Sequence, residues 1–194
     1  MAARSRARSS IAAVAVFVSL SVAAPVHAQS PTFGLGRAPT PEETRTIDIG
    51  VTPDGQGLPT GSGTAEAGKK IFESRCVTCH GATGKEGPQD VLVGGQGTLN
   101  TAKPIKTIGS YWPYATTLWD YVNRAMPFDH PGTLPTNDVY SATAYLLYLN
   151  GIVGEHDVLD QTTLPRVKMP NREGFIPDTR PDTGAKPATR RRGR

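Results

Sequence analysis

Apolar residues recur at helical spacing in two stretches in the second half of the chain. The stretch from Asn137 to Asn150 predicts a helix that Gly151 ends. Its apolar face consists of Val139, Ala142, Tyr145, Leu146 and Leu149. The earlier stretch predicts a helix from Pro113, a residue suited to a first turn, to about Ala125. Its core-facing residues are Leu118, Trp119 and Val122.

A third helix is predicted to begin at Thr64, whose hydroxyl can cap its first turn. Gly68 costs up to about 1 kcal/mol inside a helix, so it requires a packing reason. Gly68 and Phe72 lie four residues apart and share one face of this helix. On the last helix, Ala142 and Tyr145 offer a small and a large residue that can pack against Gly68 and Phe72. The first and last helices are therefore predicted to cross at Gly68.

The first helix leads into Cys76-Val77-Thr78-Cys79-His80, which contains both cysteines of the chain. Two thiols separated by two residues and followed by a histidine match the attachment signature of a c-type haem. Cys76 and Cys79 can add to the two vinyl groups of the porphyrin, and His80 can place an imidazole on the iron. The motif predicts one covalently bound haem c.

Three other interpretations of this motif compete with haem attachment. A thioredoxin-like redox pair belongs near a strand–helix–strand pattern, and the flanking sequence shows none. A zinc site needs two further Cys or His ligands at close spacing, and His27, His130 and His156 are single and scattered. The third interpretation is a chance occurrence of the motif.

Met126 is the candidate for the second axial ligand of the iron. A thioether is a soft ligand that stabilises ferrous haem and raises its reduction potential. Met126 lies 46 residues after His80, in the loop between the last two predicted helices. The alternatives are Met169, in the proline-rich stretch after the last helix, and His130, which would give a bis-imidazole site of lower potential.

Two further residues are candidates for contact with the haem or its ligands. The carbonyl of Pro88 could accept the Nδ1 proton of His80, which would fix the ring and raise its basicity; alternatively, Pro88 only stiffens a turn. Trp112 belongs to the aromatic run Tyr111-Trp112-Pro113-Tyr114. It either packs in the core against haem or donates an indole hydrogen bond to a propionate.

Residues 1–28 have the organisation of a signal peptide. Arg4, Arg6 and Arg8 precede the apolar run from Ile11 to Val22, and a small residue, Ala28, precedes the expected cleavage site. The run is shorter than the roughly 20 residues of a membrane span, although an uncleaved anchor is the alternative. We expect a periplasmic protein with no stable membrane span after cleavage.

The net charge of +4 hides an asymmetry along the chain. Without the three signal-peptide arginines, the 21 basic residues fall to 18 against 17 acidic ones. Residues 29–165 hold nine basic and fourteen acidic side chains, whereas residues 166–194 hold nine basic and three acidic. A basic end can bind nucleic acid or membranes. In an exported protein we expect no nucleic-acid partner, and a solvated tail instead.

Composition divides the mature chain into three parts. Residues 29–63, crowded with Gly, Pro, Thr and Ser, predict an extended N-terminal arm. Residues 64–154 form the compact domain, and residues 155–194 form a proline-rich basic tail. The predicted fold is all-α, with three to four helices around one haem and irregular extensions at both ends. Deletion of residues 29–60 and 166–194 is expected to leave haem binding intact.

The order of helix, Cys-x-x-Cys-His, glycine-rich loop, helix, Met-Pro and final helix resembles a class I cytochrome c over residues 64–154. A narrower resemblance is to the cytochrome subunit of Sox sulfur (sulfane) dehydrogenase, also described as S-disulfanyl-cysteine oxidoreductase. This narrower resemblance lies in residues 48–63, 108–118, 124–128, 144–151 and 165–175. Some family members carry a second haem domain, whereas this sequence contains one haem motif.

This resemblance implies a partner and a direction of electron flow. A molybdenum-cofactor subunit would oxidise sulfane sulfur held on a carrier protein, and a soluble cytochrome c would receive the electrons. Cys76, Cys79, His80 and Met126 would carry the function, and no side chain would act as an acid, base or nucleophile. The alternatives are a subunit of a sulfite dehydrogenase, a generic electron carrier, and a catalytic haem enzyme with an exchangeable sixth site.

Overall fold

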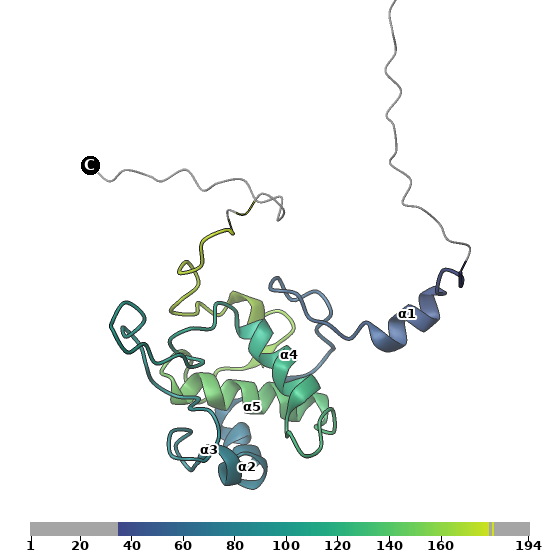
Figure 1. Cartoon of the computed structure of the whole chain (residues 1–194). Coiled ribbons are helices and arrows are strands. Elements are labelled where there is room, and N and C mark those ends of the chain that lie inside the picture. The colour runs from purple at the N-terminus through teal and green to yellow at the C-terminus, as the bar shows by residue number, and fades with distance from the viewer. Residues whose placement is uncertain (1–34, 179, 181–194) are drawn as a thin grey trace, which may run out of the picture. The chain divides into compact units, whose positions relative to one another are not determined.

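The computed structural model describes residues 35–178 and Arg180 (Figure 1). The chain divides into two units, Met1–Thr40 and Pro41–Arg194. The described part of the first unit, residues 35–40, contains no helix or strand. The elements of the second unit are α1 (Pro41–Ile47), β1 (Ser62–Gly63), α2 (Ala65–Arg75), α3 (Val77–His80), α4 (Ala115–Ala125), α5 (Thr136–Leu149), β2 (Leu159–Asp160) and the 3₁₀ helix η1 (Leu164–Arg166).

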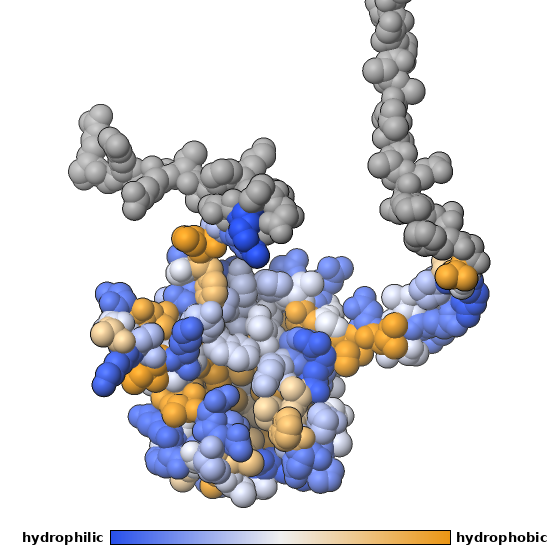
Figure 2. Space-filling view, in the orientation of Figure 1, coloured by the Kyte–Doolittle hydropathy of each residue, from blue (hydrophilic) through white to orange (hydrophobic). Residues whose placement is uncertain are grey.

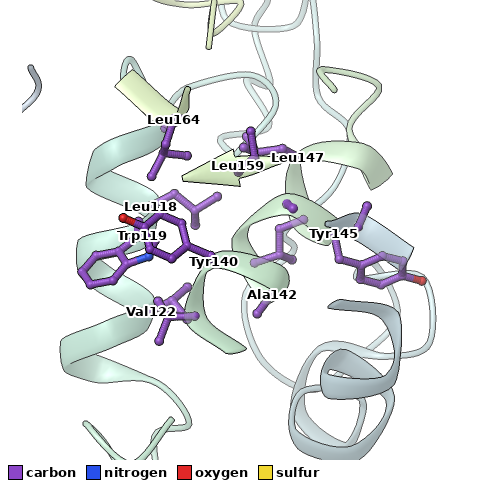
Figure 3. Packing of buried hydrophobic residues seen from close by; sticks show 14 of the residues in the cluster. Leu118, Trp119, Val122, Tyr140, Ala142, Tyr145, Leu147, Leu159 and Leu164 are labelled. Carbon is purple, nitrogen blue, oxygen red and sulfur yellow. The ribbon is translucent and has the colours of Figure 1, made fainter. Parts of the chain in front are cut away.

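The core forms around α5, against which α2 and α4 pack. Figure 3 shows Leu118, Trp119 and Val122 of α4 beside Tyr140 of α5. The rings of Trp119 and Tyr140 have centroids 5.3 Å apart. The helices predicted from the apolar spacing are therefore confirmed, although α4 begins two residues after Pro113.

The close crossing of the first and last helices is confirmed. Thr64 caps α2 as predicted, since its Oγ1 accepts a hydrogen bond of 3.3 Å from the amide of Ala67. A Cβ at Gly68 would lie 1.9 Å from the backbone oxygen of Ser141, so α5 occupies the space of a side chain. Beside it, the rings of Phe72 and Tyr145 lie 5.3 Å apart. The small partner residue is Ser141, next to the Ala142 that the sequence indicated.

A two-stranded antiparallel sheet corrects the all-α prediction. Ser62 pairs with Asp160 and Gly63 with Leu159. A Cβ at Gly63 would lie 2.3 Å from the backbone nitrogen of Ser141 on α5. Glycine at this position thus allows β1 to lie directly on α5. The composition of residues 29–63 had predicted an extended arm here instead.

The described part of residues 29–63, which was predicted to be extended or turn-rich, also contains a helix and contacts the core helices. Residues 41–47 form α1, whose first turn carries Glu42 and Glu43 where they suit the helix dipole. We call residues 51–63 the belt, because they lie along α4 and α5. The amide of Val51 donates to Asp120 (3.1 Å), and the hydroxyl of Tyr140 donates to the carbonyl of Pro59 (2.9 Å). The belt is therefore part of the fold.

The boundary placed at residue 154 is also wrong, because the chain beyond it supplies core residues. Leu159, Leu164 and Met169 are 3 %, 0 % and 3 % exposed. A deletion beginning at residue 166 would thus remove a buried side chain, that of Met169. The predicted signal peptide, residues 1–28, and the arginines of residues 190–194 lie outside the described residues. Among residues 35–178 and 180, no helix is long and apolar enough to span a bilayer.

Candidate haem site

The Cys-x-x-Cys-His motif forms the short helix α3 directly after α2. The amide of Cys76 donates to the carbonyl of Phe72 (2.9 Å), and the amide of His80 donates to that of Cys76 (2.9 Å). Residues three and four positions apart on such a turn share a face, so Cys76, Cys79 and His80 lie on one side. Cys76 is half-buried and Cys79 is exposed. The fold thus brings both thiols and the imidazole to one surface.

The His80 ring is held by a backbone carbonyl. Its Nδ1 lies 2.9 Å from the oxygen of Asp90. A carbonyl oxygen can only accept, so Nδ1 carries the proton and Nε2 presents its lone pair. This bond orients the ring and raises its basicity toward a metal. The sequence offered Pro88, two residues earlier, as a candidate acceptor, with a stiffened turn as the alternative; the acceptor is Asp90.

The loop that carries Asp90 is tied to α3 by backbone contacts. The amide of Gln89 donates to the carbonyl of Cys79 (3.0 Å). A Cβ at Gly87 would lie 2.0 Å from that same oxygen, so only glycine allows this approach. The amide of Leu92 donates to the carbonyl of Gly84 (2.8 Å) and closes the loop on itself. These contacts fix the position from which Asp90 reaches His80.

The surroundings of Cys76 do not suit a redox thiol. Burial, together with the neighbouring Cys79, raises the pKa of its thiol to about 11. Reactive Cys-x-x-Cys pairs need a thiol of lowered pKa that ionises near neutral pH. Among residues 35–178 and 180, no group of three or more His, Cys, Asp and Glu side chains is arranged to hold a metal ion.

The three candidates for the sixth ligand lie in different surroundings. Met126 ends α4 and is half-buried against the rim of the core. Met169 is 3 % exposed and belongs to the core itself. The side chain of His130 is 70 % exposed, and its Nδ1 lies 3.1 Å from a carboxylate oxygen of Asp129.

Trp112 is half-buried at the rim of the core. Its ring meets that of Tyr121 edge-on, with the centroids 5.7 Å apart. The segment after η1 holds this aromatic run in place. The side-chain amide of Asn171 donates to the carbonyl of Tyr111 (2.8 Å), and the guanidinium of Arg172 lies 4.3 Å from the centre of the Tyr114 ring.

The residues at this site fit a c-type haem by their chemistry. They supply two thiols at the attachment spacing and an imidazole in a fixed tautomer, and Met126, a separate candidate at the end of α4, carries a thioether. Half-buried apolar side chains pack against the buried core; they include Val77, Leu92, Trp112 and Met126. In Figure 2 apolar residues reach the surface among hydrophilic ones over the part of the body where α2 and α3 lie in Figure 1. Such side chains suit contact with a porphyrin.

Two residues that shape the site were not found from the sequence. Asp90 acts through its backbone oxygen, which leaves no trace in the choice of side chain. Asn150 was taken only as the end of the last helix. Its side chain donates to the carbonyl of Leu92 (3.2 Å) and accepts from the amide of Gly94 (3.0 Å). The available signal in the sequence was the position of the Asn150 side-chain amide, directly before the helix-ending Gly151.

Comparisons with known proteins identify the relatives of this chain. The family model for cytochrome c oxidase, cbb3-type, subunit III, matches residues 63–146, which include α3, Met126 and most of α5. A chain in the crystal structure of the sulfane dehydrogenase SoxCD from Paracoccus pantotrophus is 45% identical, with a TM-score of 0.70. The similarity covers 82% of this chain and 82% of that chain. No curated protein matches.

Proposed function

The chain belongs to the Sox-related class I cytochromes c, and we propose that it is the single-haem electron-transfer subunit of a periplasmic sulfur dehydrogenase. The observation that carries this proposal is the 45% identity to a chain of sulfane dehydrogenase SoxCD over 82% of the sequence. The donor set at Cys76, Cys79, His80 and Met126 supports it, because these residue types hold haem c in electron carriers.

Each proposed ligand has a distinct task. Cys76 and Cys79 attach the porphyrin covalently through thioether bonds. His80 would bind the iron through Nε2, since its Nδ1 is engaged by the Asp90 carbonyl. Met126 would supply a thioether to the iron, which would favour the ferrous state. Haem c bound in this way takes up and releases one electron at a time.

The proposed partners are a molybdenum-containing dehydrogenase subunit as donor and a soluble cytochrome c as acceptor. The dehydrogenase would oxidise sulfane sulfur, and this chain would contribute no acid, base or nucleophile. The proposed export signal, residues 1–28, would bring the protein to the periplasm, where both partners would reside. The belt and the segment after η1 are part of the fold, so the partner would bind a preformed surface there.

The haem part of this proposal is tested by producing the chain in a host that attaches haem c. Acid–acetone extraction should leave the haem on the wild-type protein, and the pyridine haemochrome spectrum should be that of two thioether bonds. Cys76→Ala and Cys79→Ala should each shift the band toward that of one free vinyl group. His130→Ala is the matched control and should leave the spectrum unchanged. Complete extraction of haem from the wild type would refute covalent attachment.

The partner part is tested by mixing the oxidised cytochrome with a purified molybdenum sulfur dehydrogenase. Reduction should follow addition of a carrier protein bearing sulfane sulfur, and it should require the dehydrogenase. Sulfite with a sulfite dehydrogenase is the competing pair. Faster reduction by that pair would assign the chain to sulfite oxidation instead.

A further inference from the structure

Asn150, directly after α5, uses both ends of its side-chain amide and is only 8 % exposed. Its Nδ2 donates to the carbonyl of Leu92 (3.2 Å) and to that of Leu146 (2.9 Å). Its Oδ1 accepts from the amide of Gly94 (3.0 Å). The residue thus joins the end of α5 to a segment more than 50 positions earlier in the chain.

Two further contacts enclose this side chain. The Gln96 side chain donates to the backbone carbonyl of Asn150 (3.1 Å), so the same segment is held at a third point. A Cβ at Gly109 would lie 2.2 Å from the Asn150 Oδ1, which leaves no room for a side chain there. The arrangement is therefore closely packed as well as hydrogen-bonded.

The segment that Asn150 holds is the one that reaches His80. Asp90, whose carbonyl lies 2.9 Å from the His80 Nδ1, is two residues before Leu92. On the other side, the amide of Gln89 is bonded to the carbonyl of Cys79 (3.0 Å). Asp90 thus lies between an anchor on α3 and an anchor on Asn150. Movement of either anchor would change the hydrogen bond to the His80 ring.

We propose that Asn150 is a positioning residue that sets the reduction potential of the haem by fixing the Asp90 carbonyl against His80. This inference rests on the proposed axial role of His80. A hydrogen bond from Nδ1 makes the imidazole a stronger donor, which stabilises ferric iron and lowers the potential. Loss of the Asn150 side chain weakens this bond, so the potential rises.

The test compares three variants of the haem-loaded protein with the wild type. Asn150→Ala removes the side-chain anchor, and Gln96→Ala removes only the bond to the Asn150 carbonyl. Asn137→Ala is the matched control, because its Oδ1 holds the amide of Ser62 (3.0 Å) at the opposite end of α5, in a contact separate from the segment that carries Asp90. The measurements are the reduction potential by spectroelectrochemical titration, and the hydrogen-exchange rates of the His80 ring N–H and the Gly94 amide by NMR.

Asn150→Ala removes the three side-chain hydrogen bonds and should raise the potential. Exchange of the Gly94 amide, which loses its own acceptor, should speed up about tenfold, and exchange of the His80 ring N–H should speed up less. Asn137→Ala should lower stability and leave the potential and the two exchange rates unchanged. If Asn150→Ala does not fold, the reduction potential of Gln96→Ala tests the inference instead. A smaller rise in potential is expected for that variant. An unchanged or lower potential would overturn the inference, as would an equal rise in Asn137→Ala.

The same proteins separate this inference from the proposed function. His80→Ala should abolish the low-spin spectrum of the wild type. If it does not, His80 is not the axial ligand, and both proposals fail. If it does, and Asn150→Ala keeps the wild-type potential, only the positioning role of Asn150 fails.

Discussion

His80 is oriented by a hydrogen bond, whereas Met126 is held by packing at the end of α4. The carbonyl of Asp90 fixes the imidazole tautomer. Met126 has only half-buried apolar contact at the core rim. A flexible thioether needs no hydrogen bond to adapt to a metal. Which of the two methionines, Met126 or Met169, would bind the haem iron therefore depends on which one the fold leaves accessible.

Substitution of Met126 should change the haem spectrum without unfolding the protein. Met126→Ala should lose the red absorption band of methionine-to-ferric-iron ligation, and its reduction potential should fall. Met169→Ala should keep that band but lower the free energy of unfolding by about 2–5 kcal/mol, because it leaves a cavity in the core. Visible spectra and urea unfolding measure the two effects. A band that persists in Met126→Ala would contradict the assignment.

Asp160 gives the turn after β2 a defined response to pH. A hydrogen bond from the Thr162 hydroxyl, with further ones from the Thr163 and Thr162 amides, lowers the pKa of its carboxyl from 3.8 to about 2. A lowered pKa means that the carboxylate stabilises the fold above pH 3.8 and that this stabilisation fades as the pH falls toward about 2.

Asp160→Asn should therefore lower the melting temperature at neutral pH, and the difference from the wild type should shrink below pH 3.8. Thr162→Val, which removes the hydroxyl donor, should show the same trend more weakly. Circular dichroism melts across this pH range provide the measurement. A difference that stays constant down to pH 2 would show that the carboxylate charge is not involved.

At the scale of single residues, what could be predicted depended on whether the chemistry resides in side chains. The two cysteines and His80 form a motif that the spacing reveals directly. The acceptor for His80 is a backbone oxygen that any residue could supply, so it was misplaced by two positions. Asn150 acts through contacts across more than 50 residues, and local patterns carry no information about such pairs.

At the scale of elements, the crossing of α2 and α5 could be predicted from one glycine. Gly68 is costly in a helix, and this cost predicted a close partner there. The structure brings the Ser141 backbone to that position and the Tyr145 ring beside Phe72. Helical spacing of apolar residues made α4 and α5 predictable, and the capping residue Thr64 made the start of α2 predictable.

Gly68→Ala should test how strongly this crossing depends on the missing side chain. Alanine gains about 1 kcal/mol of helix propensity. The new Cβ, however, would lie 1.9 Å from the Ser141 oxygen, and overpacking of this kind costs about 1–3 kcal/mol or more. The expected result is a net loss of stability in urea unfolding. Lys69→Ala, at an exposed position of the same helix, is the control and should change stability little. A more stable Gly68→Ala protein would mean that α5 can move aside.

The segment after α5 could not be predicted in the same way. Its buried residues, Leu159, Leu164 and Met169, lie five positions apart and so match neither a strand nor a helix. The prolines and charges between them indicated a solvated tail. Each buried residue is instead held by its own turn or by the short strand β2. Burial without periodicity leaves no pattern to recognise.

At the scale of the whole molecule, both flanks complete a core that the central helices leave open. The belt covers α4 and α5 from one end of the sequence, and β2 and η1 cover them from the other. The sheet joins the two flanks through Ser62 and Asp160. A small haem domain gains buried apolar surface in this way, which a short chain otherwise lacks.

Truncation of the C-terminal flank should therefore have a sharp limit. Deletion of residues 177–194 leaves Phe175, which packs on Tyr111 with centroids 5.2 Å apart, and should change the melting temperature little. Deletion of residues 156–194 removes Leu159, Leu164 and Met169, each worth about 1.5–3 kcal/mol of burial. Their sum is comparable with the roughly 5–15 kcal/mol that stabilises a typical domain, so cooperative unfolding should be lost. Calorimetry of both proteins after haem attachment measures this, and a cooperative transition in the shorter protein would show that the central helices and haem suffice.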